Sequence, residues 1–504
     1  MESLASELRA VVAVEPTAAA LEYKRRWYSW RDLSTSIERI DALLSQAGIG
    51  PDGRVGILIR NRPGQLFGIL AVLATDRCLV TLSPLLPDDK MANDIEAVRA
   101  PVIIGEAEDL ARPAIAAAIR RIGAAVIEVG IDIQQIRLLP GQERPIGPDL
   151  LLDGPDVAIE MLTSGTTGLP KRIPLTRDSF NRSFAGAIFY ERDRKPGMPA
   201  QLRPGTLLLS GPLNHIGGIY TALTCLVGGR KACLLERFSV PEWHDAVIRH
   251  RPAVTAVVPA GLRMILDANI PREDLASLKA LRTGTAPLDP AVAEEFLRRY
   301  GLPILQTYGA TEFAGAIAGW TLAEFRTHWA EKRGSVGRIH ADVEARVIDP
   351  ETGATVPPGM PGLLELRAPQ LGDAQQWKRT TDRVTIDADG FLFVHGRSDN
   401  AINRGGFKIH PDDVVKALEQ HPSVREAVVT GIADARLGEV PVAAIMLREG
   451  MAAPDVAELT AFARQHLLPY QVPVAFRIVA DVPRTPSMKP SLPELRRLFE
   501  EVAT

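Results

Sequence analysis

Residues 161–176 read MLTSGTTGLPKRIPLT, and the rest of the chain can be interpreted outward from this stretch. Glycine and hydroxyl residues fill 164–168, too many for a helix or a strand, and Lys171 follows closely. Backbone N–H groups of such residues can form an anion-binding concavity, to which a lysine adds charge. Leu169 and Pro170 separate the second glycine from the lysine, so this is not a Walker A loop. On its own, the stretch is as consistent with an exposed polar turn as with a phosphate-binding loop.

Short β-branched runs alternate with helical apolar spacing on both sides of this loop. This alternation predicts parallel sheets with helices on their faces. The expected strands are 55–60, 78–82, 101–105, 124–130, 157–162, 205–213, 231–236 and 253–260. The expected helices are 35–48, 64–74, 241–250 and 289–301.

The pattern changes near Ser335 and again after Arg397. Residues 343–353, 362–369 and 390–397 predict a small, mainly antiparallel, β-barrel-like unit. Residues 410–422, 425–432, 440–447, 455–468 and 474–481 then predict an α-β-β-α-β unit, which can form its own small α+β domain. We therefore expect an α/β fold with domains 1–398 and 399–504.

Composition excludes several classes of protein. The 504 residues are 46% hydrophobic and 24% charged, with a net charge of −3. This balance argues against nucleic acid as the main partner, since neutralising phosphates needs a basic excess. Three cysteines without a CxxC or His/Cys pattern are expected to be reduced thiols rather than disulfides or zinc ligands. No signal peptide or transmembrane run is evident, so a cytoplasmic protein is expected.

Four further segments concentrate polar and small residues near expected strand ends, where open α/β sheets bind ligands, or in loops. They are LRTGTAPLDPAVAEEF (281–296), GLPILQTYGATEFAG (301–315), TTDRVTIDADGFLFVHGRSDNAINRGGFKIHP (380–411) and PRTPSMKPS (483–491). In this order and spacing, together with YSWRDL (28–33), the set resembles the adenylate-forming superfamily. That superfamily contains acyl- and aryl-CoA synthetases, nonribosomal-peptide adenylation domains and firefly-type luciferases. The resemblance extends from about residue 15 to 495 and implies a large N-terminal domain followed by a small, mobile C-terminal domain.

The resemblance implies roles for individual residues in binding ATP. The loop that closes on the β- and γ-phosphates comprises Thr163, Ser164, Gly165, Thr166, Thr167, Gly168 and Lys171. Gly284, Thr285 and Ala286 line the adenine site, Tyr308 stacks on the base beside Gly309, and Thr311 touches the α-phosphate. Glu312 holds Mg²⁺ with Thr166, and Asp382 binds the ribose with help from Arg397. Lys489 reaches the α-phosphate and the substrate carboxylate.

The chemistry explains these residue types. A carboxylate is a poor electrophile, and its attack on the α-phosphate of ATP gives acyl-AMP and pyrophosphate. Two anions must meet, so Lys489 and Mg²⁺ are expected to offset their repulsion. A thiol then takes the acyl group after the small domain rotates about a hinge at Asp399. Gly405 and Gly406 are expected to let a pantetheine arm pass, while Arg404 and Lys408 either meet CoA phosphates or are ordinary exposed bases.

The segment LSGPLNHIGGIYTALTCLVGG (209–229) resembles the region against the acyl pocket. Asn214 and His215 stand where amino-acid-activating members carry an aspartate, which argues against an amino acid substrate. The candidate pocket residues are His215, Ile216, Ile219, Tyr220, Val258, Ala310 and Gly315. They are mostly apolar or small, so a hydrophobic fatty or aromatic monocarboxylic acid is expected. Packing in the hydrophobic core is a competing explanation for each of these residues, and it is the better explanation for Ile219 and Val258.

Three residues depart from the superfamily's pattern without removing a catalytic group. Thr381 replaces a glycine before Asp382, Met488 replaces the glycine before Lys489, and Phe407 replaces a common glutamate in the Gly-Gly loop. Met488, with Pro490 after the lysine, is expected to stiffen or redirect that loop.

The resemblance leads to one main hypothesis and two alternatives. The main hypothesis is an ATP-dependent acid–CoA ligase that uses ATP, Mg²⁺ and CoA and is a monomer or homodimer. A stand-alone enzyme that loads a carrier protein is a second interpretation. A non-catalytic adenylate-binding protein is a third, disfavoured because Lys171, Glu312, Asp382, Arg397 and Lys489 are retained.

Overall fold

The computed structural model describes residues 4–147, 150–163, 171–189, 199–372, 376–485 and 488–500. The chain forms two compact units, taken here one at a time. Unit 1 contains the described residues of 1–164, 170–333 and 368–376, and unit 2 those of 334–367 and 377–504. None of the helices in the described residues is both long and apolar enough to cross a membrane. The domain boundary expected at Asp399 stays a prediction.

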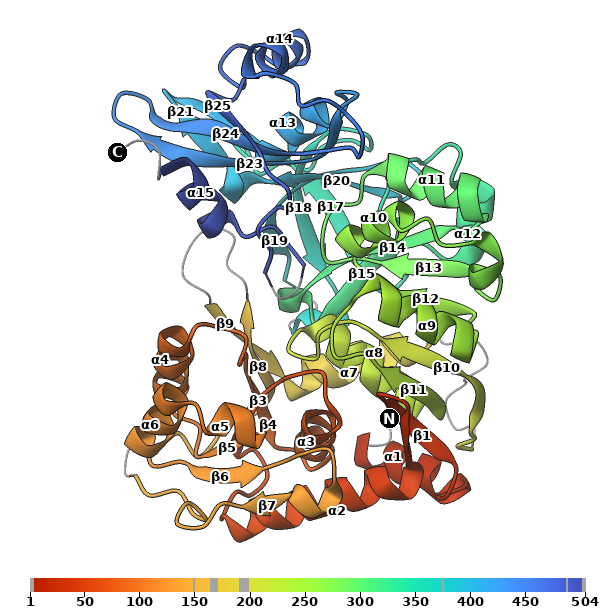
Figure 1. Ribbon diagram of the computed structural model, residues 1–504, viewed down its shortest axis with the longest axis vertical. Helices are drawn as coiled ribbons and strands as arrows, with labels where there is room; N and C mark the ends of the chain where they lie inside the picture. Colours follow the sequence, from red (N-terminus) through yellow and green to blue (C-terminus); the bar gives the residue numbers. More distant parts are fainter. Residues whose placement is uncertain are drawn as a thin grey trace. The chain divides into compact units, whose positions relative to one another are not determined.

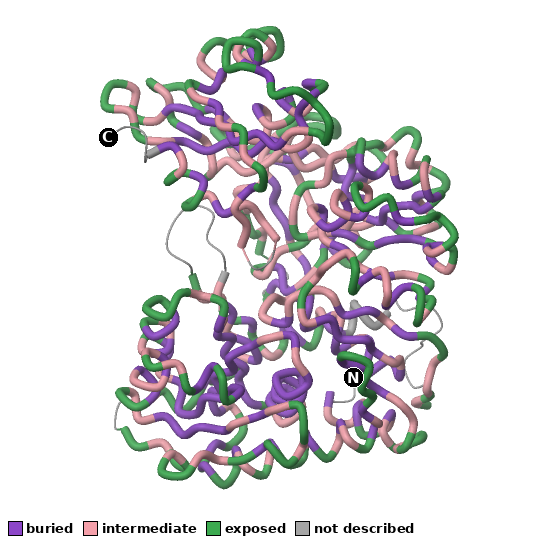
Figure 2. Tube along the Cα trace, viewed as in Figure 1, coloured by how far each residue is buried: buried purple, intermediate pink, exposed green. Residues whose placement is uncertain are grey.

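The first sheet of unit 1 follows the strand order β7-β6-β5-β3-β4-β8-β9 (Figure 1). Its strands are β3 (Arg54–Leu58), β4 (Cys78–Leu82), β5 (Val102–Gly105), β6 (Ala125–Glu128), β7 (Arg137–Leu138), β8 (Val157–Thr163) and β9 (Lys171–Thr176). Strands β6, β5, β3, β4 and β8 run parallel, and every residue of β3, β4 and β5 is buried (Figure 2). Burial on both faces explains their continuous apolar sequence.

Helices accompany this sheet. They are α2 (Trp30–Gln46), α3 (Pro63–Ala74), α4 (Asp88–Val98), α5 (Ala107–Leu110), α6 (Pro113–Ile122) and the 3₁₀ turn η1 (Ile133–Gln135). Helix α2 begins five residues before the expected position, because Ser29 and Asp32 form a reciprocal capping box that satisfies the first free N–H groups. Leu33, Ile40 and Leu44 of α2 are fully buried on one face.

The second sheet of unit 1 has the order β10-β11-β1-β2. Its strands are β1 (Ala19–Tyr23), β2 (Arg26–Ser29), β10 (Arg203–Leu209) and β11 (Arg230–Leu234), with helices α1 (Leu4–Val14), α7 (Arg177–Phe189) and α8 (Ile216–Val227). Helices α1, α3, α7 and α8 share one apolar core with the buried faces of the first two sheets. That core therefore joins the two sheets.

In the third sheet, β12, β13, β14 and β15 are neighbours in that order. The strands are β12 (Val254–Ala256), β13 (Ala280–Thr283), β14 (Ile304–Ala310) and β15 (Gly315–Gly319). The helices are α9 (Val240–His250), α10 (Pro259–Asp267), η2 (Arg272–Leu275), α11 (Pro290–Tyr300), η3 (Thr311–Phe313), α12 (Leu322–His328) and η4 (Pro369–Leu371). The expected strand 253–260 is shorter than predicted, since Pro259 opens α10.

Unit 2 contains the antiparallel sheet β17-β18-β19-β20. Its strands are β17 (Glu344–Ile348), β18 (Gly362–Arg367), β19 (Lys378–Ile386) and β20 (Leu392–Arg397), preceded by the two-residue β16 (Arg338–Ile339) and followed by η5 (Ser398–Asn400). This confirms the small antiparallel unit expected after Ser335.

The rest of unit 2 is the expected α-β-β-α-β arrangement, built around the sheet β22-β21-β24-β23 with β25 beside β24. Its elements are β21 (Ile402–Arg404), β22 (Phe407–Ile409), α13 (Pro411–Leu418), β23 (Val424–Asp434), β24 (Gly438–Leu447), α14 (Val456–His466), β25 (Ala475–Ile478) and α15 (Leu492–Glu500). The hairpin β21–β22 and α15 are additions that the periodicity did not predict. Helices α13 and α14 pack in one apolar cluster and α15 in another.

Candidate active site

Two of the predicted adenine-binding segments begin at the same edge of the third sheet. Strands β13 and β14 are parallel neighbours, with Thr283 opposite Gln306, so the residues that follow β13 lie beside the last residues of β14, which include Tyr308 and Gly309. A Cβ added to Gly284 would lie 2.8 Å from Thr307 Oγ1. A glycine at 284 therefore lets the backbone lie directly against β14, where a side chain would not fit.

Backbone strain gathers in these same segments. Thr285 has a φ of 70° and Ala314 a φ of 52°, both in the left-handed region. A Cβ on Gly309 would collide with the Gly315 carbonyl oxygen, because β14 and β15 approach closely there. Strain of this kind in non-glycine residues is concentrated at functional sites. The Tyr308 ring lies 6.2 Å from the Phe313 ring, measured between centroids.

The phosphate loop is described only at its ends. Thr163 ends β8 and pairs with Lys171, which opens β9, so the loop begins and ends on adjacent antiparallel strands. The predicted contacts of Ser164, Gly165, Thr166, Thr167 and Gly168 lie outside the described residues. Thr311 and Glu312 open η3, where the Glu312 carboxylate is exposed. A carboxylate oxygen suits Mg²⁺, which prefers hard oxygen ligands, so Glu312 fits the expected metal.

The predicted acyl-pocket segment turns sharply before α8. His215 is the N-cap residue of that helix, and its N–H donates to the Pro212 carbonyl. A Cβ on Gly218 would collide with the Pro212 carbonyl oxygen, whereas one on Gly217 would meet open space. The His-x-x-Gly spacing therefore has a steric cause: only a glycine at 218 lets the loop fold back on the helix.

Helix α7 connects two predicted pocket residues that are distant in sequence. Tyr220 of α8 lies against Phe180 and Phe184, with ring centroids 5.5 and 6.4 Å away, and burial raises its pKa. Ser183 donates to the Ala314 carbonyl, and its hydroxyl would stand 2.8 Å from a Cβ on Gly315. The sequence reasoning missed α7, although its FxxxF spacing (180–184) was a readable signal.

The remaining pocket candidates differ in burial. Ile219 is fully buried in the joint core, in agreement with the core-packing interpretation. Ile216 packs half-buried against the same core, while Val258 and Ala310 are partly exposed. Their contact with a substrate stays a prediction.

Asn61 is a residue that the sequence analysis overlooked. Its Nδ2 donates to the Gly211 carbonyl at 2.9 Å, and its Oδ1 accepts from the Leu213 N–H at 2.8 Å. The side chain is buried and therefore fixes the loop that leads to His215.

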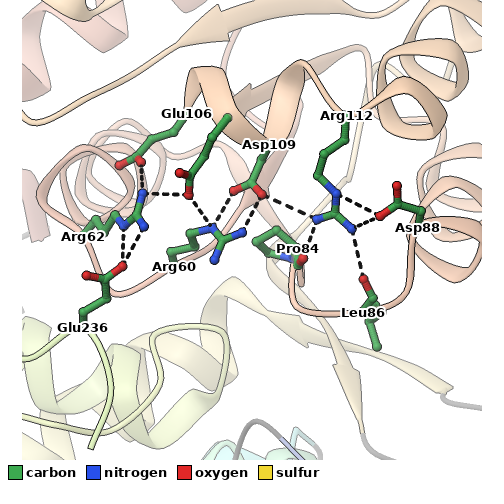
Figure 3. A network of polar contacts seen from close by, with 10 residues as sticks. Arg60, Arg62, Pro84, Leu86, Asp88, Glu106, Asp109, Arg112 and Glu236 are labelled. Carbon is green, nitrogen blue, oxygen red and sulfur yellow. Dashed lines mark hydrogen bonds and ion pairs between the residues drawn. The ribbon is translucent and has the colours of Figure 1, made fainter.

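The neighbours of Asn61 extend a chain of ion pairs (Figure 3). Arg60 forms two hydrogen bonds with Asp109, each 2.7 Å long, and Arg62 pairs with Glu106 and Glu236. Asp109 is 1% exposed, so its charge is compensated within the fold rather than by water. The β3–α3 connection is thereby tied to α5 and to the end of β11.

In unit 2, the predicted ribose-binding residues lie opposite each other. Asp382 of β19 and Arg397 of β20 are register partners on antiparallel strands. Arg397 also forms a two-pronged ion pair with the expected hinge residue Asp399, at 2.8 and 2.6 Å. The preceding Gly396 has a φ of 111°, and any side chain there would collide with Asp412 of α13. The geometry thus places Asp382, Arg397 and Asp399 together, while their roles stay predictions.

The Gly-Gly loop turns the chain between β21 and β22. Gly405 and Gly406 have φ values of 57° and 90°, and a Cβ on Gly406 would meet open space. Arg404 Nη1 donates to the Tyr470 carbonyl at 2.7 Å, so this guanidinium also has an anchoring role. Phe407 is 56% exposed and stacks on the Tyr470 ring at 4.6 Å. Lys408 is exposed.

The catalytic lysine predicted at 489 lies in a hairpin whose two arms pair at Arg484 and Pro490. The Thr485 N–H donates to the Lys489 carbonyl at 2.7 Å, and the Met488 N–H donates to the Thr485 carbonyl at 2.8 Å. Met488, directly before the lysine, has a φ of 64°. This left-handed conformation is one that glycine adopts freely and that other residues adopt only at a cost. The structure therefore explains why a glycine is usual before this lysine.

One buried cluster was not expected from sequence. Glu22, Cys233 and His250 bring potential metal-ligand atoms within 4.8 Å of one another, since Glu22 and Cys233 are opposite on β1 and β11. However, Arg249 Nη1 lies 2.7 Å from a Glu22 oxygen and 3.0 Å from His250 Nε2. Burial and Glu22 also raise the pKa of the Cys233 thiol to about 12, which disfavours the thiolate. The cluster is therefore better described as an internal ion pair.

Two protein-family models match most of the chain. Residues 8–373 match the family model described as AMP-binding enzyme, and residues 414–489 match the AMP-binding enzyme C-terminal domain. A 2-succinylbenzoate–CoA ligase of Bacillus pumilus is 29% identical over 493 residues, covering 94% of each chain. A feruloyl-CoA synthase of an Amycolatopsis species is 29% identical over 505 residues, covering 96% of this chain and 97% of that one.

Solved structures share the fold. The o-succinylbenzoate CoA synthetase of Bacillus subtilis, in complex with its acyl-adenylate intermediate, superposes with a TM-score of 0.76. It is 23% identical and covers 98% of this chain and 97% of its own. The expectation of a large N-terminal α/β domain followed by a small C-terminal domain is confirmed by this likeness together with the two family matches.

Proposed function

The chain belongs to the AMP-binding enzyme family, and from this premise we propose that it is a carboxylic acid–CoA ligase that works through an acyl-adenylate. As an acid–thiol ligase it uses ATP, Mg²⁺ and CoA. The observation that carries the proposal is that Gly284–Ala286 leave β13 beside the end of β14, which carries Tyr308 and leads into Thr311 and Glu312. In open α/β sheets, ligands bind at this position.

In the first half-reaction, a substrate carboxylate oxygen attacks the α-phosphorus of ATP and pyrophosphate leaves. Thr311 contacts the α-phosphate, and Lys489 stabilises the charge that develops between the two anions. Glu312 and Thr166 would hold Mg²⁺, which would supply positive charge against that of the phosphates. Asp382 and Arg397 hold the ribose. Positioning carries most of the catalysis, because this step needs little proton transfer.

In the second half-reaction, the thiol sulfur of CoA attacks the acyl carbon and AMP leaves. Gly405 and Gly406 suit the passage of the pantetheine arm, since neither carries a side chain. Phe407 and Tyr470 offer an exposed aromatic surface beside that path. Lys408 is a candidate partner for the CoA phosphates.

The substrate is a hydrophobic monocarboxylic acid, and an aromatic one is favoured over an aliphatic one. Relatives are named for 2-succinylbenzoate and for the feruloyl group, both of which contain a ring. The aromatic cluster of Tyr220, Phe180 and Phe184 gives the predicted pocket segment apolar surroundings, with rings that are nearly buried and packed against one another.

A coupled assay tests the proposal. The protein is incubated with ATP, Mg²⁺ and a panel of aromatic and aliphatic acids, and pyrophosphate release is measured before and after CoA is added. Acyl-CoA formation supports the proposal, and pyrophosphate without thioester favours a carrier protein as acceptor. Absence of pyrophosphate with every acid contradicts the proposal.

The role of Lys489 is tested in the two half-reactions separately. Lys489→Ala is expected to lower acyl-AMP formation at least about a hundredfold, and to leave thioester formation from supplied acyl-AMP nearly unchanged. Lys378→Ala, which removes an exposed lysine of the same unit, is the matched control. Equal losses in both half-reactions would refute the assigned role.

A further inference from the structure

The hairpin that carries Lys489 is fastened at its base by backbone contacts. The Ser491 N–H donates to the Pro483 carbonyl at 2.7 Å, and Arg484 is paired with Pro490 across the hairpin. The Lys489 N–H donates to Thr485 Oγ1 at 3.3 Å. These contacts define where the lysine leaves the backbone, but they do not relieve the left-handed conformation of Met488.

Arg484 connects this hairpin to the core sheet of unit 2. Its Nη2 donates to both carboxylate oxygens of Glu426 on β23, at 2.8 and 2.7 Å. Its Nη1 donates to the carbonyl oxygen of Met488 at 3.3 Å. One guanidinium therefore links a fixed strand to the strained residue that immediately precedes Lys489.

The burial of this pair shows that it differs from a surface ion pair. The side chains of Arg484 and Glu426 are only 14% and 13% exposed. Exposed pairs contribute little, because water screens them and the side chains lose freedom. A shielded pair with good geometry is stronger, and loss of one partner leaves an uncompensated charge. The planar guanidinium also fixes direction, which a lysine ammonium does not.

We propose that Arg484 is a positioning residue for adenylation: its ion pair with Glu426 holds the Met488 carbonyl, and thereby sets the backbone from which Lys489 acts. The inference rests on the proposed role of Lys489. It adds that the lysine is presented by a strained hairpin whose conformation is maintained by a contact from outside the loop. A methionine at 488 makes this contact necessary, because it does not adopt a positive φ as readily as glycine.

The test compares Arg484→Gln and Arg484→Lys in the full chain. Arg484→Gln is expected to slow acyl-AMP formation about 10- to 100-fold, the loss typical of a small misplacement in an active site. Thioester formation from supplied acyl-AMP is expected to change less than about twofold. Arg484→Lys should retain intermediate activity, since an ammonium can pair with Glu426 but lacks the guanidinium fork.

Two controls distinguish positioning from general stability. Arg346→Gln removes another Arg–Glu pair of unit 2, with Glu365 at 2.7 Å. It should leave the rates of both half-reactions unchanged while its melting temperature falls about as much as that of Arg484→Gln. Combining Arg484→Gln with Met488→Gly should make the adenylation loss several-fold smaller, because glycine holds the left-handed conformation without support. If Arg484 had a purely structural role, Arg484→Gln would cause the same loss of adenylation whether residue 488 is methionine or glycine.

The outcomes separate this inference from the proposed function. A selective loss in Arg484→Gln that shrinks in the Met488→Gly background supports it. Unchanged adenylation in Arg484→Gln, or equal loss in both half-reactions, overturns it, provided that Lys489→Ala slows adenylation alone. If wild type releases no pyrophosphate, or if Lys489→Ala slows both half-reactions equally, the proposed function itself fails and the inference fails with it.

Discussion

Replacing Met488 by glycine or by alanine tests the strain inferred in the lysine hairpin. The two variants differ by one methyl group, and both remove the thioether side chain. Met488 has a φ of 64°, which glycine adopts freely and alanine does not. The difference between the variants therefore isolates the backbone conformation from any contact of the methionine side chain.

The expected magnitude follows from two opposing contributions. An L-residue in the left-handed region costs roughly 1–2 kcal/mol, whereas glycine loses about 0.5–1 kcal/mol through the freedom of its unfolded chain. The hairpin of Met488→Gly should therefore be about 0.5–1 kcal/mol more resistant to local opening than that of Met488→Ala. This free-energy difference corresponds to a roughly two- to fivefold change in the opening equilibrium.

Hydrogen exchange followed by mass spectrometry measures this opening. The amide of residue 488 bonds to the Thr485 carbonyl and that of Lys489 to the Thr485 hydroxyl, so both should exchange more slowly in Met488→Gly than in Met488→Ala. The control is Ala461→Gly, at an exposed position within α14, where the same chemical change should cost about 1 kcal/mol. The sign of the alanine-to-glycine effect is thus opposite at the two sites.

Equal exchange in the two Met488 variants would refute the argument. So would faster exchange in Met488→Gly, since it would mean that the methyl group favours the hairpin. In either case Arg484 would have no strained residue to hold, and the positioning inference would lose its physical cause.

Two other predictions concern unit 1. Gly218→Ala should raise the KM for the acid at least several-fold, because its Cβ would collide with the Pro212 carbonyl and displace the loop that leads to His215. Gly217→Ala should behave as wild type in the same steady-state assay, since its Cβ would meet open space. Equal KM values in the two variants would contradict the steric role assigned to Gly218. Burial alone would raise the Glu236 pKa, but hydrogen bonds from Lys24 and Arg62 outweigh it and lower the pKa to about 2. The stabilisation that ionised Glu236 contributes is therefore complete above the ordinary glutamate pKa of about 4.3 and is lost as pH falls towards 2. The apparent melting temperature of Glu236→Gln should consequently fall less than that of wild type on acidification. Parallel plots of melting temperature against pH for the two proteins would contradict this prediction.

The sequence was most informative where local chemistry determines structure. Runs of buried β-branched residues predicted β3, β4 and β5, and the small residues around 284 and 309 predicted segments that meet at one sheet edge. The start of α2 was missed because its first turn is defined by the cap at Ser29 rather than by apolar spacing. Periodicity does not detect such a polar signal, although the reciprocal Ser29–Asp32 pattern could have been read directly.

Contacts between distant residues account for what the sequence did not predict. Arg484 and Glu426 are separated by 58 residues, and nothing in either local stretch identifies the other as its partner. The methionine at 488 was recognisable as a departure, but its consequence depends on a dihedral angle that only the folded hairpin defines. A residue that is unfavourable in isolation is retained when a neighbouring contact supports its conformation, so departure and support have to be interpreted together. For this enzyme, the lysine proposed to act in adenylation can be identified from sequence, whereas the contact proposed to position it, the Arg484–Glu426 pair, is defined only by the folded chain.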